Sequence, residues 1–148
     1  MPKSLSELFH TSKECKEHSC KVNRKNIKQI YKPDNGFLDK QIAQQLLGSE
    51  YKICDCIIEC QDESVAIVEI LCGKLTPREM REKKQQLESC CKVLKYTQQH
   101  DKISKIVLFY DKLESSNRQP MMKKALINQR ICNKTLEFKN DKPLAIGC

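Results

Sequence analysis

Residues 51–76, YKICDCIIECQDESVAIVEILCGKLT, decide the fold class of this chain. Two runs rich in apolar and β-branched residues, 51–60 and 65–72, flank the polar segment 61–64. This pattern predicts two strands joined by a hairpin loop. The second run is apolar at nearly every position, which is typical of a central strand that is covered on both faces.

Each predicted strand contains one acidic residue among apolar neighbours, Asp55 in the first and Glu69 in the second. Burying a carboxylate is costly unless a cation or a hydrogen-bond donor compensates it. Because side chains alternate between the two faces of a strand, hairpin pairing is expected to bring Asp55 and Glu69 onto one face. Carboxylate oxygens suit Mg²⁺ or Mn²⁺, so the pair predicts a shared metal site. The alternative is that both acids are strand-end charges paired with lysines.

The flanking segments predict the rest of an α/β fold. Apolar residues at helical spacing indicate a helix over 37–47, and Thr76, Pro77 and Glu79 form the start signal of a helix that runs to about residue 99. We expect a third buried strand over 104–110, a short basic helix over 121–129 and an edge strand over 134–138. The order α-β-β-α-β-α-β predicts a sandwich with a mixed sheet. A turn signal at 31–36 separates a basic N-terminal extension, 1–34, from an α/β domain, 35–148.

The spacing from Asp55 through Glu69 to position 71 resembles the signature of the PD-(D/E)xK nuclease superfamily. Within that superfamily, the pattern is most similar to archaeal Holliday junction resolvases and related archaeal or viral nucleases. The resemblance covers roughly residues 37–111. It implies a restriction-endonuclease-like three-layer sandwich with a central mixed sheet, catalytic roles for Asp55 and Glu69 as ligands of Mg²⁺ or Mn²⁺, and a homodimer.

Position 71 departs from the signature, because Leu71 stands where the superfamily has a catalytic lysine. A lysine there would orient the attacking water and stabilise the charge that builds on the phosphate, and a leucine can do neither. Two explanations stay open. Lys74 replaces the motif lysine in an active endonuclease, or the scaffold is catalytically degenerate and binds nucleic acid without cutting it. A looser alignment places Asp39, and either Gln85 or Gln86, at further positions of the superfamily.

The net charge of +8 favours a polyanionic partner, most simply DNA. Aromatic residues make up 5% of the chain and tryptophan is absent, so contacts of Lys and Arg with the phosphate backbone are expected rather than base stacking. The rival hypothesis is a non-catalytic interaction or assembly protein whose basic surface is incidental. The candidate nucleic-acid-binding residues are Lys21, Arg24, Lys25, Lys28, Lys123, Lys124 and Arg130.

Ten cysteines are many for a chain in which we find neither a secretion signal nor a membrane span. We therefore expect a cytoplasmic protein whose cysteines are mostly buried free thiols, packed as small hydrophobic residues. A disulfide between neighbouring strands is also conceivable for the cysteines at 54, 56, 60 and 72.

An N-terminal cluster combines two histidines with two cysteines, which are the ligands that zinc prefers. Its unusual spacing leaves three interpretations: a zinc site, a disulfide between the two cysteines, or a solvated basic arm in which the four residues are incidental. The four residues are His10, Cys15, His18 and Cys20.

Overall fold

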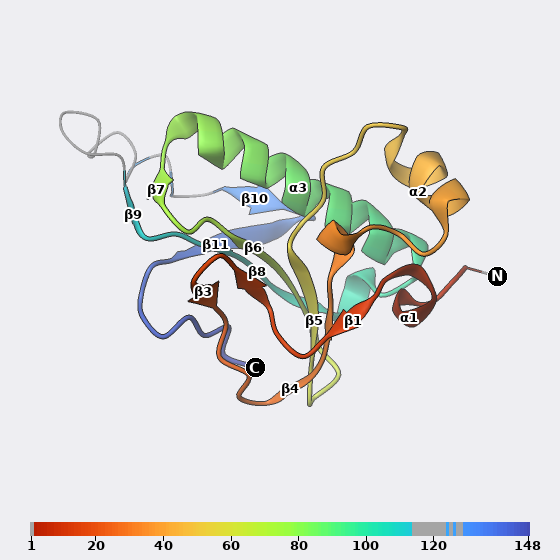
Figure 1. The fold of residues 1–148 in the computed structure, drawn as a ribbon, viewed down its shortest axis with the longest axis horizontal. Coiled ribbons are helices and arrows are strands. Elements are labelled where there is room, and N and C mark those ends of the chain that lie inside the picture. The colour runs from red at the N-terminus through yellow and green to blue at the C-terminus, as the bar shows by residue number, and fades with distance from the viewer. Residues whose placement is uncertain (1, 114–123, 125, 127–128) are drawn as a thin grey trace.

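A seven-stranded mixed sheet forms the centre of the protein in the computed structural model, which describes residues 2–113, 124, 126 and 129–148 (Figure 1). The strand order is β1-β4-β5-β6-β8-β11-β10. The pairs β1–β4, β4–β5 and β5–β6 are antiparallel, whereas β6, β8 and β11 are mutually parallel. The strands are β1 (Thr11–Ser12), β4 (Ile27–Tyr31), β5 (Cys56–Cys60), β6 (Val65–Ile70), β8 (Ile103–Phe109), β10 (Arg130–Ile131) and β11 (Lys134–Lys139).

Helix α3 (Pro77–Tyr96) makes the crossover that the parallel pair β6 and β8 requires (Figure 1). It begins as the sequence predicts, because Glu79 N–H donates to the hydroxyl of Thr76 at 3.1 Å. Its inner side buries Leu87, Val93 and Leu94 in the core beneath the sheet. The remaining helical segments are α1 (Leu5–Leu8), α2 (Lys40–Leu47) and the short 3₁₀ turns η1 (Pro33–Asn35) and η2 (His100–Lys102).

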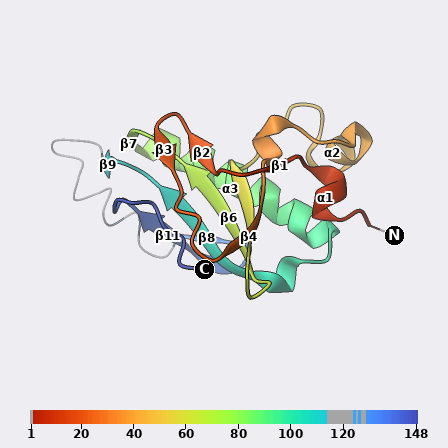
Figure 2. The same ribbon diagram turned by 60° about the horizontal axis from the view of Figure 1, so that its bottom comes forward.

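The opposite face of the sheet is covered by the N-terminal segment and the C-terminal tail (Figure 2). A short hairpin, β2 (Lys16–Glu17) and β3 (Cys20–Lys21), precedes a bridge between Val22 and Leu144. A separate parallel pair, β7 (Lys74–Leu75) and β9 (Lys112–Leu113), lies outside the main sheet. Residues 1–34, which we expected to form an extension, contribute β1 and β4 to the sheet.

The α/β class and the mixed sheet are confirmed, and most predicted elements occur with shifted ends. Helix α2 starts at Lys40 because Asp39 caps it, accepting bonds from Gln41 and Ile42 N–H. The first predicted strand, 51–60, is shortened to β5, so that Asp55 lies immediately before the strand. The third predicted strand corresponds to β8, and the edge strand to β11. Most of the predicted helix 121–129 falls outside the described residues.

The expectation of free thiols is wrong, because all ten cysteines form disulfides. Cys15 and Cys20 bond to different partners across the sheet face, so the predicted bond between them does not form. With these bonds formed, neither sulfur is available to the predicted zinc site with His10 and His18. The five pairs are Cys15–Cys56, Cys20–Cys72, Cys54–Cys90, Cys60–Cys148 and Cys91–Cys132.

Over the part of the chain that the structure describes, no helix combines the length and the apolar character needed to cross a bilayer.

Candidate functional site

Asp55 and Glu69 meet where β5 begins and β6 ends. Cys56 pairs with Val68, which places Asp55 and Glu69 at the next position of the antiparallel ladder. Glu69 Oε1 accepts a hydrogen bond from Asp55 N–H at 2.9 Å, and Asp55 Oδ2 accepts one from Ile70 N–H at 2.7 Å. Each carboxylate is therefore fixed to the backbone across the hairpin.

Glu69 is fully buried, with 0% of its surface exposed, and its second oxygen faces a lysine. Its Oε2 lies 2.9 Å from Lys83 Nζ, an ion pair, and has no hydrogen-bond partner among the described residues. Burial raises the pKa of Glu69 to about 7, and the charge of Lys83 opposes that rise. Burial lowers the pKa of Lys83, but attraction to Glu69 outweighs this and leaves the pKa above its ordinary value.

Lys83 is a residue of this site that the motif spacing did not indicate. The available signal was the spacing of residues along the helix. Met80 and Leu87 lie on its inner side, and Lys83, three residues after Met80 and four before Leu87, shares that side. Lys74, the residue we proposed as the substitute, is exposed in β7, where its backbone pairs with Lys112. Leu71 packs against the core. The cation that contacts Glu69 comes from the helix after β6, not from the strand or its exit turn.

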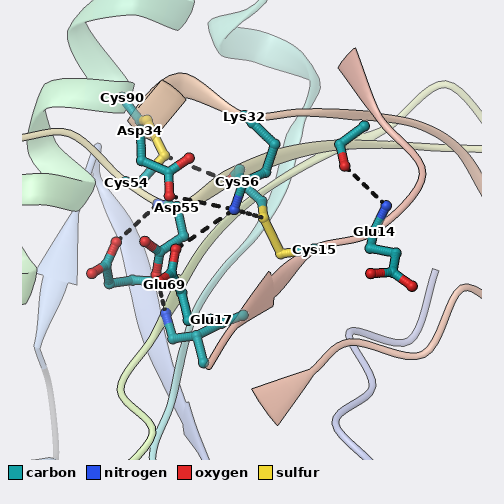
Figure 3. The surroundings of a disulfide bond; sticks show 12 residues. Glu14, Cys15, Glu17, Lys32, Asp34, Cys54, Asp55, Cys56, Glu69 and Cys90 are labelled. Carbon is teal, nitrogen blue, oxygen red and sulfur yellow. Dashed lines mark hydrogen bonds and ion pairs between the residues drawn. A yellow bond between two sulfur atoms is a disulfide. The ribbon is translucent and has the colours of Figure 1, made fainter. Parts of the chain in front are cut away.

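A second group of acids adjoins Asp55 (Figure 3). Glu17, Asp34 and Asp55 each have a carboxylate oxygen within 4.8 Å of the other two. The buried Lys32, 7% exposed, lies 3.3 Å from Asp34 Oδ2 and 3.6 Å from Glu17 Oε1. The acids of this group come from β2, η1 and the loop before β5, three segments that are far apart in the sequence.

The acids of this site outnumber the two lysines, and their ionisation reflects that imbalance. Burial and the neighbouring charge of Glu69 raise the pKa of Asp55 to about 9. Burial and the neighbouring Glu17 raise the pKa of Asp34 to about 6. These shifts mean that the folded protein resists placing all of the negative charges there together unless a further cation is present.

A cavity of about 520 Å³ adjoins this site. Asp34 and Lys83 lie in its wall, whereas Asp55, Glu69 and Glu17 are not among its lining residues. Gln86, one turn after Lys83, also lines it, and its buried Oε1 has no hydrogen-bond partner among the described residues. The remaining lining residues are Pro33, Gly36, Tyr51, Lys52, Ile53, Glu79 and Glu82.

The residues present fit a hard divalent cation. Mg²⁺ and Mn²⁺ bind carboxylate oxygens in preference to nitrogen or sulfur, and Mg²⁺ usually keeps several waters for which a solvent-connected cavity leaves room. Glu17, Asp34 and Asp55 offer carboxylate oxygens within 4.8 Å of one another, beside Glu69, and the two lysines do not balance the charge of these acids. The site can therefore hold an oxygen-liganded metal next to a fixed ammonium group.

The other residues singled out from the sequence lie apart from this group. Asp39 pairs with Lys3 at 2.9 Å while capping α2. Among the candidate nucleic-acid contacts, Lys21 pairs with Glu14 at 2.8 Å, and Arg130 donates to the carbonyl of Asn133. Four further candidates are exposed, namely Arg24, Lys25, Lys28 and Lys124. The seventh candidate, Lys123, lies outside the described residues.

The sequence matches no protein-family model, and neither curated proteins nor solved structures give a significant match.

Proposed function

We propose that this protein is a divalent-metal-dependent DNA nuclease with a restriction-endonuclease-like fold of the PD-(D/E)xK type. The observation that carries this proposal is the meeting of Asp55, Glu69 and Lys83 at one end of the sheet. The antiparallel strands β4 to β6, followed by a crossover helix and the parallel strand β8, agree with the fold that the sequence resemblance implies. In this proposal, Lys83 supplies the positive charge that Leu71 cannot.

Asp55 and Glu69 would hold the metal, with Asp34 at the mouth of the cavity as a further ligand. When bound, Mg²⁺ or Mn²⁺ lowers the pKa of a coordinated water and neutralises charge on a phosphate oxygen. Lys83 acts as a cation rather than as a base, because its pKa lies above the ordinary value and it stays protonated at neutral pH. Held in a largely buried position, its ammonium stabilises charge that develops on the scissile phosphate.

The substrate would be held by contacts with its backbone. The net charge of +8 raises the local concentration of a polyanion, and exposed lysine and arginine side chains on the N-terminal segment can neutralise phosphates. Binding of this kind depends strongly on salt concentration and weakly on base sequence.

A cleavage assay with matched variants tests the proposal. The protein is incubated with linear, supercoiled and four-way-branched DNA in Mg²⁺, Mn²⁺ or EDTA. We expect cleavage in metal only, and a rate at least about 100-fold lower for Glu69→Gln and Lys83→Met, since each removes charge stabilisation in the transition state. Lys92→Met is the control, because Lys92 is an exposed lysine of the same helix.

The outcomes separate the candidate functions. Equal cleavage by the wild type and Glu69→Gln would remove this site from the reaction. Loss in Lys74→Met, with Lys83→Met unaffected, would return the catalytic role to Lys74. Salt-dependent DNA binding without cleavage in either metal would leave a degenerate, DNA-binding scaffold, and failure to bind DNA at low salt would leave the interaction protein with an incidental basic surface.

A further inference from the structure

Asp55 lies between two half-cystines whose bonds lead to opposite faces of the sheet (Figure 3). Cys54 belongs to the core on the helical face and bonds to Cys90 of α3. Cys56 belongs to the core on the other face and bonds to Cys15 of the N-terminal segment. Strict strand alternation would place both sulfurs on one face. Cys54 differs because β5 begins only after Asp55.

Each of the two disulfides connects Asp55 to another component of the site. Cys90 follows Lys83 by seven positions, two helical turns, so both residues lie on the side of α3 that faces the strands. Cys15 precedes Glu17 by two positions and immediately precedes β2, the strand that contains Glu17. The triplet Cys54-Asp55-Cys56 is thus linked covalently to the helix that carries Lys83 and to the hairpin that carries Glu17.

The two connections differ in how much other structure supports them. Helix α3 has 20 residues and buries Leu87, Val93 and Leu94 in the core, so packing holds Lys83 in place. Strands β2 and β3 have two residues each, which is too few for a hairpin to be stable by itself. The hairpin that presents Glu17 is fixed by two disulfides, the fully buried Cys15–Cys56 and the more accessible Cys20–Cys72.

We propose that Glu17 is a further ligand of the metal site and that the Cys15–Cys56 disulfide is the link that positions it. This inference rests on the metal site of the proposed function. Opening the bond to two thiols takes two electrons and two protons from a dithiol reductant, which itself becomes a disulfide. The hairpin then keeps only the Cys20–Cys72 bond, which leads to a residue beyond the end of β6, so Glu17 is no longer held beside Asp55 and leaves the site while Asp55, Glu69 and Lys83 stay.

Mn²⁺ binding to the intact protein, measured by calorimetry and by the electron paramagnetic resonance line shape of Mn²⁺, tests this inference without any need for cleavage. We expect Glu17→Gln to weaken Mn²⁺ binding about tenfold, the scale on which removal of a metal-site partner acts. The paired variant Cys15→Ala/Cys56→Ala should weaken binding equally and give the same altered line shape. The triple variant should bind Mn²⁺ no more weakly than Glu17→Gln alone, because the substitution and the loss of the disulfide both act through the Glu17 carboxylate. Glu17→Asp should restore part of the affinity.

Cys91→Ala/Cys132→Ala is the matched control, since it removes a disulfide that involves no residue of the Glu17 hairpin or of the Cys54-Asp55-Cys56 triplet, and it should bind Mn²⁺ as the wild type does. Glu17 is partly exposed, so Glu17→Gln is expected to fold even if the cysteine variants do not. Wild-type affinity in Glu17→Gln, with binding abolished in Glu69→Gln, would overturn this inference and leave the proposed function standing. A wild-type protein that binds no Mn²⁺ would overturn both.

Discussion

At the scale of single residues, the site is defined by a buried carboxylate that depends on one ammonium group. Glu69 is completely buried, and Lys83 is the lysine that contacts it. Removing one member of a buried ion pair leaves an uncompensated charge in a medium of low dielectric constant. The metal-free protein should therefore be sensitive to the loss of Lys83 in a way that surface lysines do not share.

We predict that Lys83→Met lowers the free energy of unfolding of the metal-free protein by roughly 2–4 kcal/mol. Urea unfolding in EDTA measures it. Lys92→Met is the control and should change stability by no more than about 0.5 kcal/mol. The double variant Lys83→Met/Glu69→Gln should be more stable than Lys83→Met alone, because its buried side chain is neutral. A Lys83→Met protein as stable as the control would contradict the ion pair.

The raised pKa values of the acids predict how stability depends on pH. Between the ordinary pKa of 3.8 and about 9, Asp55 binds more protons in the folded than in the unfolded protein, and Glu69 does so between 4.5 and about 7. The free energy of unfolding of the metal-free protein should therefore fall as pH rises through this window.

Urea unfolding in EDTA at a series of pH values checks this dependence. Asp55→Asn should flatten the slope, whereas Glu88→Gln, at an exposed position of α3, should not. Added Mn²⁺ should stabilise the protein more as pH rises, because protons compete with the metal for the carboxylates. Stability that increases with pH in EDTA would contradict the burial of the two acids.

The sequence predicted this site in part. Asp55 and Glu69 could be paired because strand alternation and a short hairpin loop constrain their positions locally. Finding Lys83 requires knowing how α3 packs on the sheet. The position of Lys83 on the inner face of the helix is consistent with that packing, but the motif spacing pointed to positions 71 and 74 instead. Glu17 and Asp34 could not be found, since three distant segments must pack before their carboxylates approach Asp55.

At the scale of elements, the helix that carries Lys83 depends on its first turn. Thr76 caps α3, and Lys83 lies within the next two turns. Elements with strong local signals, such as α2, α3, β5, β6 and β8, were predicted. Strands β1 and β4 were not predicted. Lys28 and Gln29 interrupt the apolar pattern of β4, and this strand is held by pairing with β1 and β5.

Thr76→Ala should lower the free energy of unfolding by about 1 kcal/mol, the usual effect of removing an N-cap side chain. Thermal unfolding followed by circular dichroism measures it. Thr97→Ala, at the other end of the helix, removes a hydroxyl that bonds to the Leu94 carbonyl and serves as the control for loss of a threonine. Equal effects of the two substitutions would argue against a specific role of the cap.

At the scale of the whole molecule, the disulfides are the largest departure from our expectations. We expected mostly reduced thiols, and the five disulfides contradict that expectation. The pairing could not be obtained from the sequence, because it depends on which segments cover each face of the sheet. Cys56 and Cys54 are two positions apart, yet they bond to opposite sides.

Thiol titration tests the pairing directly. In denaturant without reductant, the protein should show no reactive thiols, and after full reduction it should show ten. Full reduction should also lower the melting temperature markedly, because each closed loop of this length contributes on the order of 3–5 kcal/mol. Two or more reactive thiols in the unreduced protein would show that at least one pair is open.

The order of the disulfides along the chain has a consequence for proteolysis. The bonded intervals 15–56, 20–72 and 60–148 overlap and together span residues 15–148. A protease that cuts once anywhere in that span therefore produces two pieces that remain joined. Nicked protein should migrate as one band in a non-reducing gel and separate into fragments only after reduction, so enzymatic damage to the backbone need not release any part of the molecule.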